Sequence, residues 1–287
     1  MPRPSHTFTL VTDAAVARSR LAGLVTREPE SLSVIASVTE SLVAEPDRYA
    51  GPRWWVVADT AGEVVGAFMH TPPHPLHVAL ATAEQARDLA ALLAADGDTL
   101  PGVGGLREPA EAFADEWTAR TDNTATVTMR VGRFDLPERP RVPFEVAGSF
   151  RVATGADCAL VDEWHQQFVD AIEGGGRTVA SLVRTVEAGR VGLWEHDGRT
   201  VSMAYASSPS GGVTRISGVW TPRELRGHGY ASAVVAALSS DRQDAGEACM
   251  LYTDLANPTS NAIYRALGYR RVGESVTIGF GRAGLSA

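Results

Sequence analysis

The same series of predicted helices and strands occurs twice along this chain, and the fold must accommodate both copies. Each copy begins with two helical segments, continues with two strands joined by a glycine turn, and ends with a strand and a helix. The two turns contain Gly62 and Gly198. The expected segments are 12–25, 30–45, 53–59, 63–70, 77–82 and 83–95 in the first copy, and 155–172, 177–188, 192–195, 200–206, 214–220 and 230–241 in the second. The pattern predicts a duplicated αα-ββ-β-α unit, with mixed sheets in an α/β (α+β) protein.

A proline-rich, charged stretch over residues 136–143 separates the two copies and is typical of a linker. We therefore expect two domains, residues 1–138 and 139–287. At 287 residues and 44% hydrophobic content, the chain can bury a sizeable core in each of them.

The second copy carries a glycine-rich loop between its last strand and its helix. Residues 216–220 form a short apolar run, which ends at Thr221-Pro222 because proline cannot donate to a sheet ladder. The sequence Arg226-Gly227-His228-Gly229-Tyr230-Ala231 then leads into the helix. Glycines allow a ligand to approach the backbone closely, and the amides at a helix start favour anions. The loop is therefore a candidate diphosphate site, with a plain glycine-rich turn as the alternative.

A Rossmann dinucleotide site is a further alternative for this loop, but two residues disfavour it. Ser232 stands where a third glycine would be required. Glu247 lies before the next strand, whereas the acidic residue that binds the ribose should end that strand.

A second group of polar residues follows the strand expected over residues 250–253. Asn257 is a good N-cap and Pro258 suits the first helical position, while Gly268 suits the end of a helix over 258–267. Asn257, Asn261 and Tyr264 are spaced to share one face of that helix. Ile263 and Leu267 are expected to face the core.

These two segments together resemble the acyl-CoA-binding half of the GCN5-related N-acetyltransferase (GNAT) superfamily. The loop matches the family pattern Arg/Gln-x-x-Gly-x-Gly/Ala, and residues 257–269 match Asn-x-x-x-Asn-x-x-Tyr-x-x-x-Gly-Phe/Tyr. The resemblance implies that acetyl-CoA is the co-substrate and that the main chain near Val219 and Thr221 pairs with its pantetheine arm. The cofactor-binding residues that it implies are Val219, Thr221, Arg226, Gly227, His228, Gly229, Tyr230, Ala231, Asn257 and Asn261.

The resemblance also implies direct transfer of the acetyl group to a primary amine, with Tyr264 as the general acid that protonates the departing thiolate. Phenols ionise near pH 10, so a tyrosine keeps its proton at neutral pH. No metal and no covalent enzyme intermediate are required. The general base stays open, with Asp254, Glu173, Glu163, His165 and His228 as candidates.

The first copy lacks the residues of both segments, which predicts a degenerate GNAT-like domain. Its helix at residue 83 follows Thr82 directly, without a glycine or an arginine, and its last helix, about 109–119, has no asparagine or tyrosine. Residues 101–106 are glycine-rich, and we expect a turn there rather than a phosphate site.

Composition is consistent with a soluble enzyme and narrows the partners. The net charge of −8 disfavours nucleic acid, and no apolar run approaches the length of a membrane span. All 26 basic residues are arginine, so a lysine nucleophile is excluded. Cys158 and Cys249 are too few for a disulfide framework or a metal cluster. Because the N-terminus also has no signal pattern, we expect a cytoplasmic protein. We expect it to be a monomer or a homodimer.

Two alternatives from other classes stand beside the N-acetyltransferase. A non-catalytic acyl-CoA sensor or scaffold could keep the glycine loop but has less need of Tyr264. A methyltransferase or dehydrogenase requires a parallel sheet, which the hairpin over 192–206 contradicts. The acceptor is an amine-bearing small molecule or peptide, and its recognition is expected in the helical region 155–190, including the mobile-looking loop 173–177.

Overall fold

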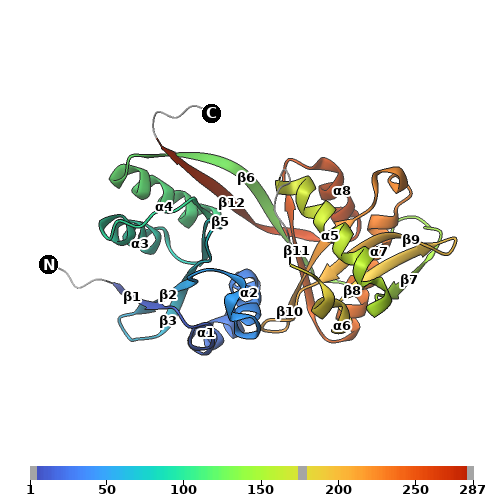
Figure 1. Ribbon diagram of the computed structural model, residues 1–287, viewed down its shortest axis with the longest axis horizontal. Coiled ribbons are helices and arrows are strands. Elements are labelled where there is room, and N and C mark those ends of the chain that lie inside the picture. Colours follow the sequence, from blue (N-terminus) through green and yellow to red (C-terminus); the bar gives the residue numbers. More distant parts are fainter. Residues whose placement is uncertain (1–4, 174–179, 283–287) are drawn as a thin grey trace. The chain divides into compact units, whose positions relative to one another are not determined.

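The computed structural model describes residues 5–173 and 180–282 of the chain (Figure 1). Two compact units are present, each with helices packed against a mixed sheet. The first unit contains the residues up to Gly132 together with Asp254–Ala256 and the chain from Gly273 onward. The second contains Arg133–Thr253 and Asn257–Val272.

The first unit orders its strands as β1-β2-β3-β4-β5-β12, and β12 is followed by β6. Strands β1 to β4 are antiparallel neighbours, β4 and β5 are parallel, and β5 and β12 are antiparallel. The strands are β1 (His6–Val11), β2 (Arg53–Asp59), β3 (Val64–His70), β4 (Leu76–Leu80), β5 (Gly102–Leu106), β6 (Asn123–Leu136) and β12 (Arg270–Arg282). The helices are α1 (Ala14–Arg27), α2 (Ser33–Ala44), α3 (Ala83–Ala95) and α4 (Arg107–Arg120), with the short 3-10 turn η1 (Pro46–Arg48).

The second unit repeats this arrangement with the strand order β11-β10-β9-β8-β7. Its one parallel pair, β10 with β11, corresponds to β4 with β5. The strands are β7 (Ser149–Val152), β8 (Val191–His196), β9 (Arg199–Ala206), β10 (Val213–Trp220) and β11 (Ala248–Asp254). The helices are α5 (Cys158–Glu173), α6 (Val183–Glu187), α7 (Tyr230–Asp244) and α8 (Pro258–Ala266), with the 3-10 turns η2 (Gly155–Asp157) and η3 (Arg223–Leu225).

The duplicated pattern predicted from the sequence is confirmed. Each hairpin turns where a glycine was expected, and Asp197 and Gly198 both have positive φ, as a tight two-residue turn requires. The expectation of a turn over residues 101–106 was wrong, because Gly102–Leu106 is strand β5. A Cβ on Gly102 or Gly105 would overlap the backbone of Ile278 or Val78, so these glycines permit close strand packing.

Each unit has two hydrophobic clusters, one on each face of its sheet. In the first unit, α3 and α4 cover one face and α1 and α2 the other. In the second unit, α7 and α8 pack on one face, and α5 and α6 on the opposite face. This arrangement gives the parallel pair β10–β11 a helix-covered surface on both sides.

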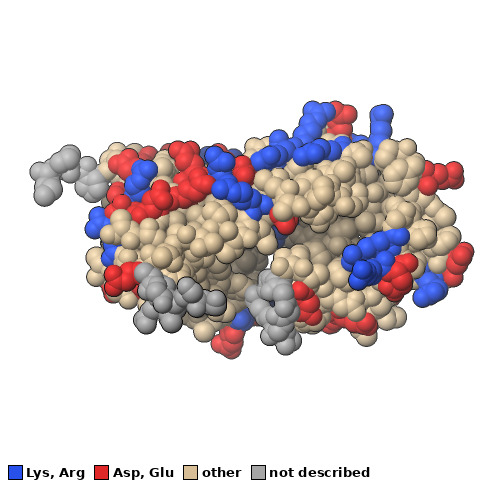
Figure 2. All heavy atoms as spheres, turned by 90° about the horizontal axis from the view of Figure 1, so that it is seen from above, with Lys and Arg blue, Asp and Glu red and all other residues tan. Residues whose placement is uncertain are grey.

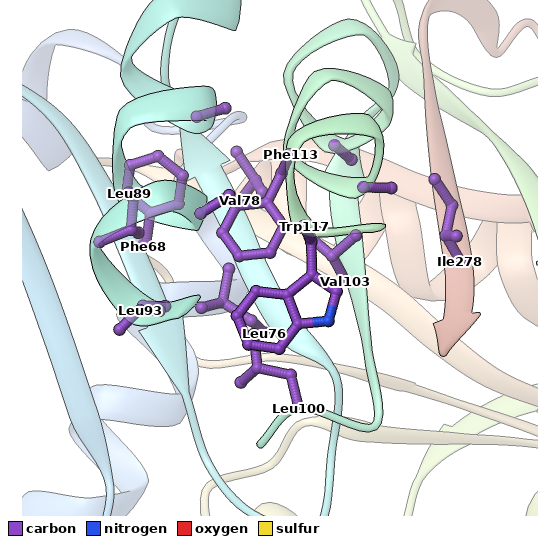
Figure 3. Close-up of a cluster of buried hydrophobic side chains, with 14 of the residues drawn as sticks. Phe68, Leu76, Val78, Leu89, Leu93, Leu100, Val103, Phe113, Trp117 and Ile278 are labelled. Carbon is purple, nitrogen blue, oxygen red and sulfur yellow. The ribbon is translucent and has the colours of Figure 1, made fainter. Parts of the chain in front are cut away.

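The core beneath α3 and α4 includes residues from the far end of the sequence. Ile278 of β12 lies in the same cluster as Phe113 and Trp117 of α4 (Figure 3). Trp117 also stacks on Phe280, with the ring centroids 5.8 Å apart. The sequence-based division at residue 138/139 does not foresee this exchange of a C-terminal strand into the N-terminal unit.

Charged side chains of both signs are interspersed on the surface (Figure 2). Several form exposed ion pairs, such as Arg18 with Glu40 and Arg139 with Asp244. Within the described residues, none of the helices combines the length and apolar character that crossing a membrane requires.

We expect Ile278→Ala to destabilise the protein by about 2–5 kcal/mol, because it leaves a cavity in a buried core. Val272→Ala is the matched control in the same strand, since Val272 is 46% exposed. Chemical unfolding measures the difference, and amide exchange in β5 and α4 locates it. Equal stability of the two variants would contradict the role of β12 in this core.

Candidate cofactor site

The parallel strands β10 and β11 pair only over the first half of their length. Their register runs from Val213 opposite Ala248 to Ile216 opposite Leu251. Beyond Ile216, the register of β10 with β9 shifts between Ser217 and Trp220. The main chain of β10 therefore leaves the regular ladder on the edge that faces β11.

A glycine bulge causes this change in β10. Gly218 has a φ of +58°, and a Cβ at this position would overlap the ring of Tyr205 on β9. A larger residue is therefore excluded by both backbone conformation and space. The apolar pattern over residues 216–220 predicts a plain strand without this bulge, although a glycine inside an apolar strand is the usual signal for one.

The predicted anion loop connects this bulged strand to α7. Gly227 and Gly229 have φ values of +85° and +81°, and Gly229 is the N-cap of α7 without a side-chain hydrogen bond. The first backbone bond into the helix joins the Ala233 N–H to the Gly229 carbonyl at 3.0 Å. The amides of the preceding residues, Tyr230, Ala231 and Ser232, have no acceptor in the helix and form a positive helix end.

The equivalent helix start in the first unit is closed by its own side chains. The Thr82 hydroxyl accepts from the Gln85 N–H at 3.2 Å, and the Gln85 side chain accepts from the Thr82 N–H at 3.0 Å. Glu84 adds a carboxylate in the first turn of α3. The Gln85 amide of the first turn is thus occupied and the Glu84 carboxylate disfavours an anion there, which gives a physical reason for the degenerate character of this half.

Arg226 is held against the end of β10. Its Nε donates to the Thr221 carbonyl at 3.0 Å, and its guanidinium lies 5.4 Å from the centre of the Trp220 ring. Thr221 itself is buried and its hydroxyl lies 2.9 Å from the Ser202 hydroxyl. These contacts fix the loop and keep a positive charge beside the start of α7.

His228 and Tyr230 pack on each other within the loop. Their ring centroids are 5.4 Å apart with an interplanar angle of 13°, and the His228 Nδ1 lies 3.2 Å from the Leu225 carbonyl oxygen. Tyr230 is buried, whereas His228 is exposed. The contacts of His228 are those of a loop-forming residue.

Helix α8 begins as predicted, and its two asparagines differ in burial. The Asn257 side chain caps the helix by accepting from the Ser260 N–H at 3.1 Å, and it is exposed. Asn261 is buried, and its Nδ2 donates to the Asn257 carbonyl at 2.7 Å. A contact of either side chain with a cofactor stays a prediction.

Tyr264 lies on the buried side of α8, in one cluster with Ile216 and Val219 of β10 and Leu251 of β11. The ring therefore packs where the two strands stop pairing. Tyr264 is only 8% exposed, and burial raises the pKa of its phenol to about 12. The sequence placed Ile263 and Leu267 on a core face apart from Tyr264, but Leu267 is buried in the same cluster as Tyr264 and Ile263 is only partly buried there.

The candidate general bases lie in different parts of the second unit or at its edge. Asp254 and Glu163 are exposed, and their side chains accept from the Ala256 N–H at 2.8 Å and the Gln167 amide at 3.0 Å. His165 of α5 packs edge-on against Tyr205, with the ring centroids 5.5 Å apart. The side chain of Glu173 and most of the loop 173–177 lie outside the described residues. His165 is therefore the candidate that the fold brings next to the bulge of β10, through Tyr205.

The sequence analysis also missed Arg215, which points to the same face of β10 as Tyr205. Burial lowers the pKa of its guanidinium, an effect that the nearby Tyr252 and Tyr205 hydroxyls oppose. An arginine inside an apolar strand is the signal that could have identified it. The face of the sheet that α5 covers thus carries aromatic rings and the Arg215 guanidinium.

Comparisons with known proteins agree with this architecture. The family model described as FR47-like protein matches residues 190–278. No curated protein sequence matches the chain significantly.

Similar solved structures cover nearly the whole chain. They include a GCN5-related N-acetyltransferase from Sphaerobacter thermophilus, 13% identical over 98% of each chain with a TM-score of 0.61. An acetyltransferase of the GNAT family from Colwellia psychrerythraea is 11% identical over 96% of this chain and 100% of its own, with a TM-score of 0.57. A tandem GNAT protein from the clavulanic acid biosynthesis pathway is 15% identical over 98% of this chain and 100% of its own, with a TM-score of 0.54.

The fold is therefore that of the GNAT acetyltransferases, present in two tandem copies. The family-model match falls on the second of these copies.

We expect Ala231→Glu to abolish binding of acetyl-CoA without unfolding the protein. A carboxylate in the first turn stabilises a helix, but it repels a diphosphate at the same amides. This change reproduces the place of Glu84 in the first unit, because both residues follow their N-cap by two positions. Ala237→Glu, farther along α7, is the control and should retain binding in a thermal-shift titration. Undiminished binding by Ala231→Glu would contradict the site.

The raised pKa of Tyr264 gives a second expected outcome. Because burial disfavours the phenolate, the pKa lies above its ordinary value of 10, and the proton stays on Tyr264 until the pH approaches about 12. In an ultraviolet titration of the folded protein up to pH 11, wild type and Tyr264→Phe should show the same phenolate absorbance. A smaller absorbance in the variant would mean that Tyr264 ionises normally.

Proposed function

We propose that this protein is an N-acetyltransferase that moves an acetyl group from acetyl-CoA to a primary amine by direct transfer. The observation that carries the proposal is the contrast between the two helix starts. The start of α7 is left open by Gly229, whereas the start of α3 is closed by Thr82 and Gln85. A chain that needed only a turn at Gly229 would have no use for uncapped amides beside Arg226.

Different residues of the second unit bind different parts of acetyl-CoA. The amides after Gly229 and the Arg226 side chain bind the diphosphate. The main chain near Val219 and Thr221 pairs with the pantetheine arm, because the pairing of β10 with β11 ends at Ile216. An amide near Val219 polarises the thioester carbonyl. This order leads the acyl end to the opening between β10 and β11.

Tyr264 is the general acid of the transfer. The neutral amine nitrogen forms a bond to the carbonyl carbon, and the carbon–sulfur bond breaks. The amine loses one proton to solvent, and the Tyr264 hydroxyl donates one to the departing sulfur and recovers it from solvent. The buried ring at the end of the β10–β11 pairing suits this role, because a pKa near 12 guarantees a protonated donor.

The amine acceptor enters from the α5 side of the sheet. That side carries Tyr205, Trp220 and His165, whereas α7 and α8 cover the opposite face. An amine that reaches the opening from there meets the thioester without crossing the diphosphate site. The acceptor class is an amine-bearing small molecule or peptide.

The Tyr264→Phe variant tests the chemical role of this residue. Loss of the phenolic proton should lower kcat by about 10²–10⁴-fold, the usual contribution of a general acid. The dissociation constant for acetyl-CoA should stay within about twofold, because the ring that packs in the core is kept. Thiol release with a panel of amines measures turnover, and calorimetry measures binding.

The same experiment distinguishes the enzyme from a non-catalytic acyl-CoA sensor. Equal thiol release by wild type and Tyr264→Phe would reject the general-acid role. Binding of acetyl-CoA without thiol release by the wild type, for every amine in the panel, would favour the sensor. Tyr49→Phe, a tyrosine change in the first unit, is the control for a general loss of activity.

A further inference from the structure

A short segment of the chain is strapped across the second unit beside the proposed cofactor site. We call residues 141–147 the strap. Near its start, the Arg141 N–H donates to the Leu267 carbonyl at 3.3 Å, and Val142 packs on the cluster under α7 and α8. At its end, the Ala147 carbonyl accepts from the Trp194 Nε1 at 3.0 Å. The strap is thus fixed on both sides of its middle residues.

The middle of the strap lies directly on the N-cap of α7. A Cβ at Gly229 would overlap the ring of Phe144 and would lie 3.1 Å from the Val146 Cγ2. Gly229 is therefore required for two reasons, its positive φ and the approach of the strap. The same contact places the Phe144 ring next to the open amides of the helix.

Phe144 nevertheless leaves half of its surface uncovered, at 52% exposed. An exposed phenyl ring that is held in place beside an anion site can contact, through its flat apolar face, the part of the ligand next to the anionic group. A single exposed apolar residue needs no explanation by itself, but this one is fixed by the strap at the rim of the site. The position indicates a ligand contact.

The direction of the proposed ligand identifies which part meets Phe144. The pantetheine arm leaves the diphosphate toward the bulge of β10, so the nucleoside leaves it on another side of the helix start. Adenine has a π-face that stacks on aromatic rings. Arg141 near the start of the strap is exposed and forms no ion pair with the described residues.

We infer that Phe144 is the stacking face for the adenine of the acyl donor, and that the strap selects a nucleotide-bearing donor over an acyl-phosphopantetheine. The inference rests on the proposed function, because it concerns the outer end of the same site. It assigns a binding role to the segment that joins the two GNAT copies.

Calorimetry on the full chain tests the inference with two ligands, acetyl-CoA and acetyl-4′-phosphopantetheine, which keeps a phosphate but lacks the nucleoside. Phe144→Ala should weaken the binding of acetyl-CoA about tenfold, the factor that corresponds to about 1.4 kcal/mol. Binding of acetyl-4′-phosphopantetheine should be unchanged. Phe144→Trp should retain the wild-type affinity for acetyl-CoA, because it keeps an aromatic face.

Two further variants separate stacking from folding. Phe144→Leu keeps an apolar contact with Gly229 but removes the ring, and it should lose affinity for acetyl-CoA as Phe144→Ala does. Val272→Ala removes exposed apolar surface elsewhere and should bind both ligands normally. Thermal unfolding without ligand shows whether each variant is folded, and the leucine variant carries the test if the alanine variant is not.

The outcomes distinguish the inference from the proposed function. Wild-type affinity for acetyl-CoA in Phe144→Leu, or an equal loss for both ligands, would overturn the inference and leave the proposed function standing. If the wild type bound neither ligand, the proposed function would be rejected and the inference with it.

Discussion

The backbone of β10 at Gly218 is the feature on which the rest of the site depends. A parallel pair normally satisfies its amides and carbonyls along its whole length, and ligands then meet only side chains. Here the pairing of β10 with β11 stops after Ile216, because Gly218 takes a positive φ that other residues rarely adopt. The end of the β10–β11 pairing and the buried Tyr264 therefore lie in one region of the second unit. The Tyr205 ring fills the space that a Cβ would need, so the bulge is supported by packing from the α5 side.

The two copies show how small a difference separates a binding helix end from a closed one. Both α3 and α7 follow the first strand of a parallel pair, and both begin with unsatisfied amides. In α3 the Thr82 hydroxyl satisfies the Gln85 amide, the Gln85 side chain satisfies the Thr82 amide, and Glu84 places a carboxylate in the first turn that repels an anion. A left-handed glycine in α7 contributes no such group. The side-chain cap stabilises the start of α3. The start of α7 has no such cap and keeps a positive electrostatic potential, which the proposed function assigns to ligand binding.

Tyr264 illustrates how packing adjusts the chemistry of a residue that local sequence can only nominate. Its spacing from Asn257 and Asn261 places it on α8 in a predictable way. The burial of its ring in the cluster with β10 and β11 then raises the phenol pKa to about 12, so the hydroxyl keeps its proton at neutral pH. Phe144 is the opposite case, because its immediate sequence contains no recognisable motif. Its place beside Gly229 arises from the anchoring of the strap at Leu267 and Trp194.

The sequence by itself determined the local features of this protein: the repeated helices and hairpins, the open glycine loop at Arg226–Ala231, the cap at Asn257 and the face of α8 that carries Tyr264. These depend on periodicity, capping and backbone freedom, which act over a few residues. Only the tertiary structure decided the bulge at Gly218, the buried Arg215, the strap at Phe144 and the pairing of β12 with β5 in the N-terminal unit. Each of these depends on a partner that is distant in the sequence. Because strand pairing and side-chain packing over such separations leave no local pattern, the sequence could name most of the candidate site but not how it is enclosed.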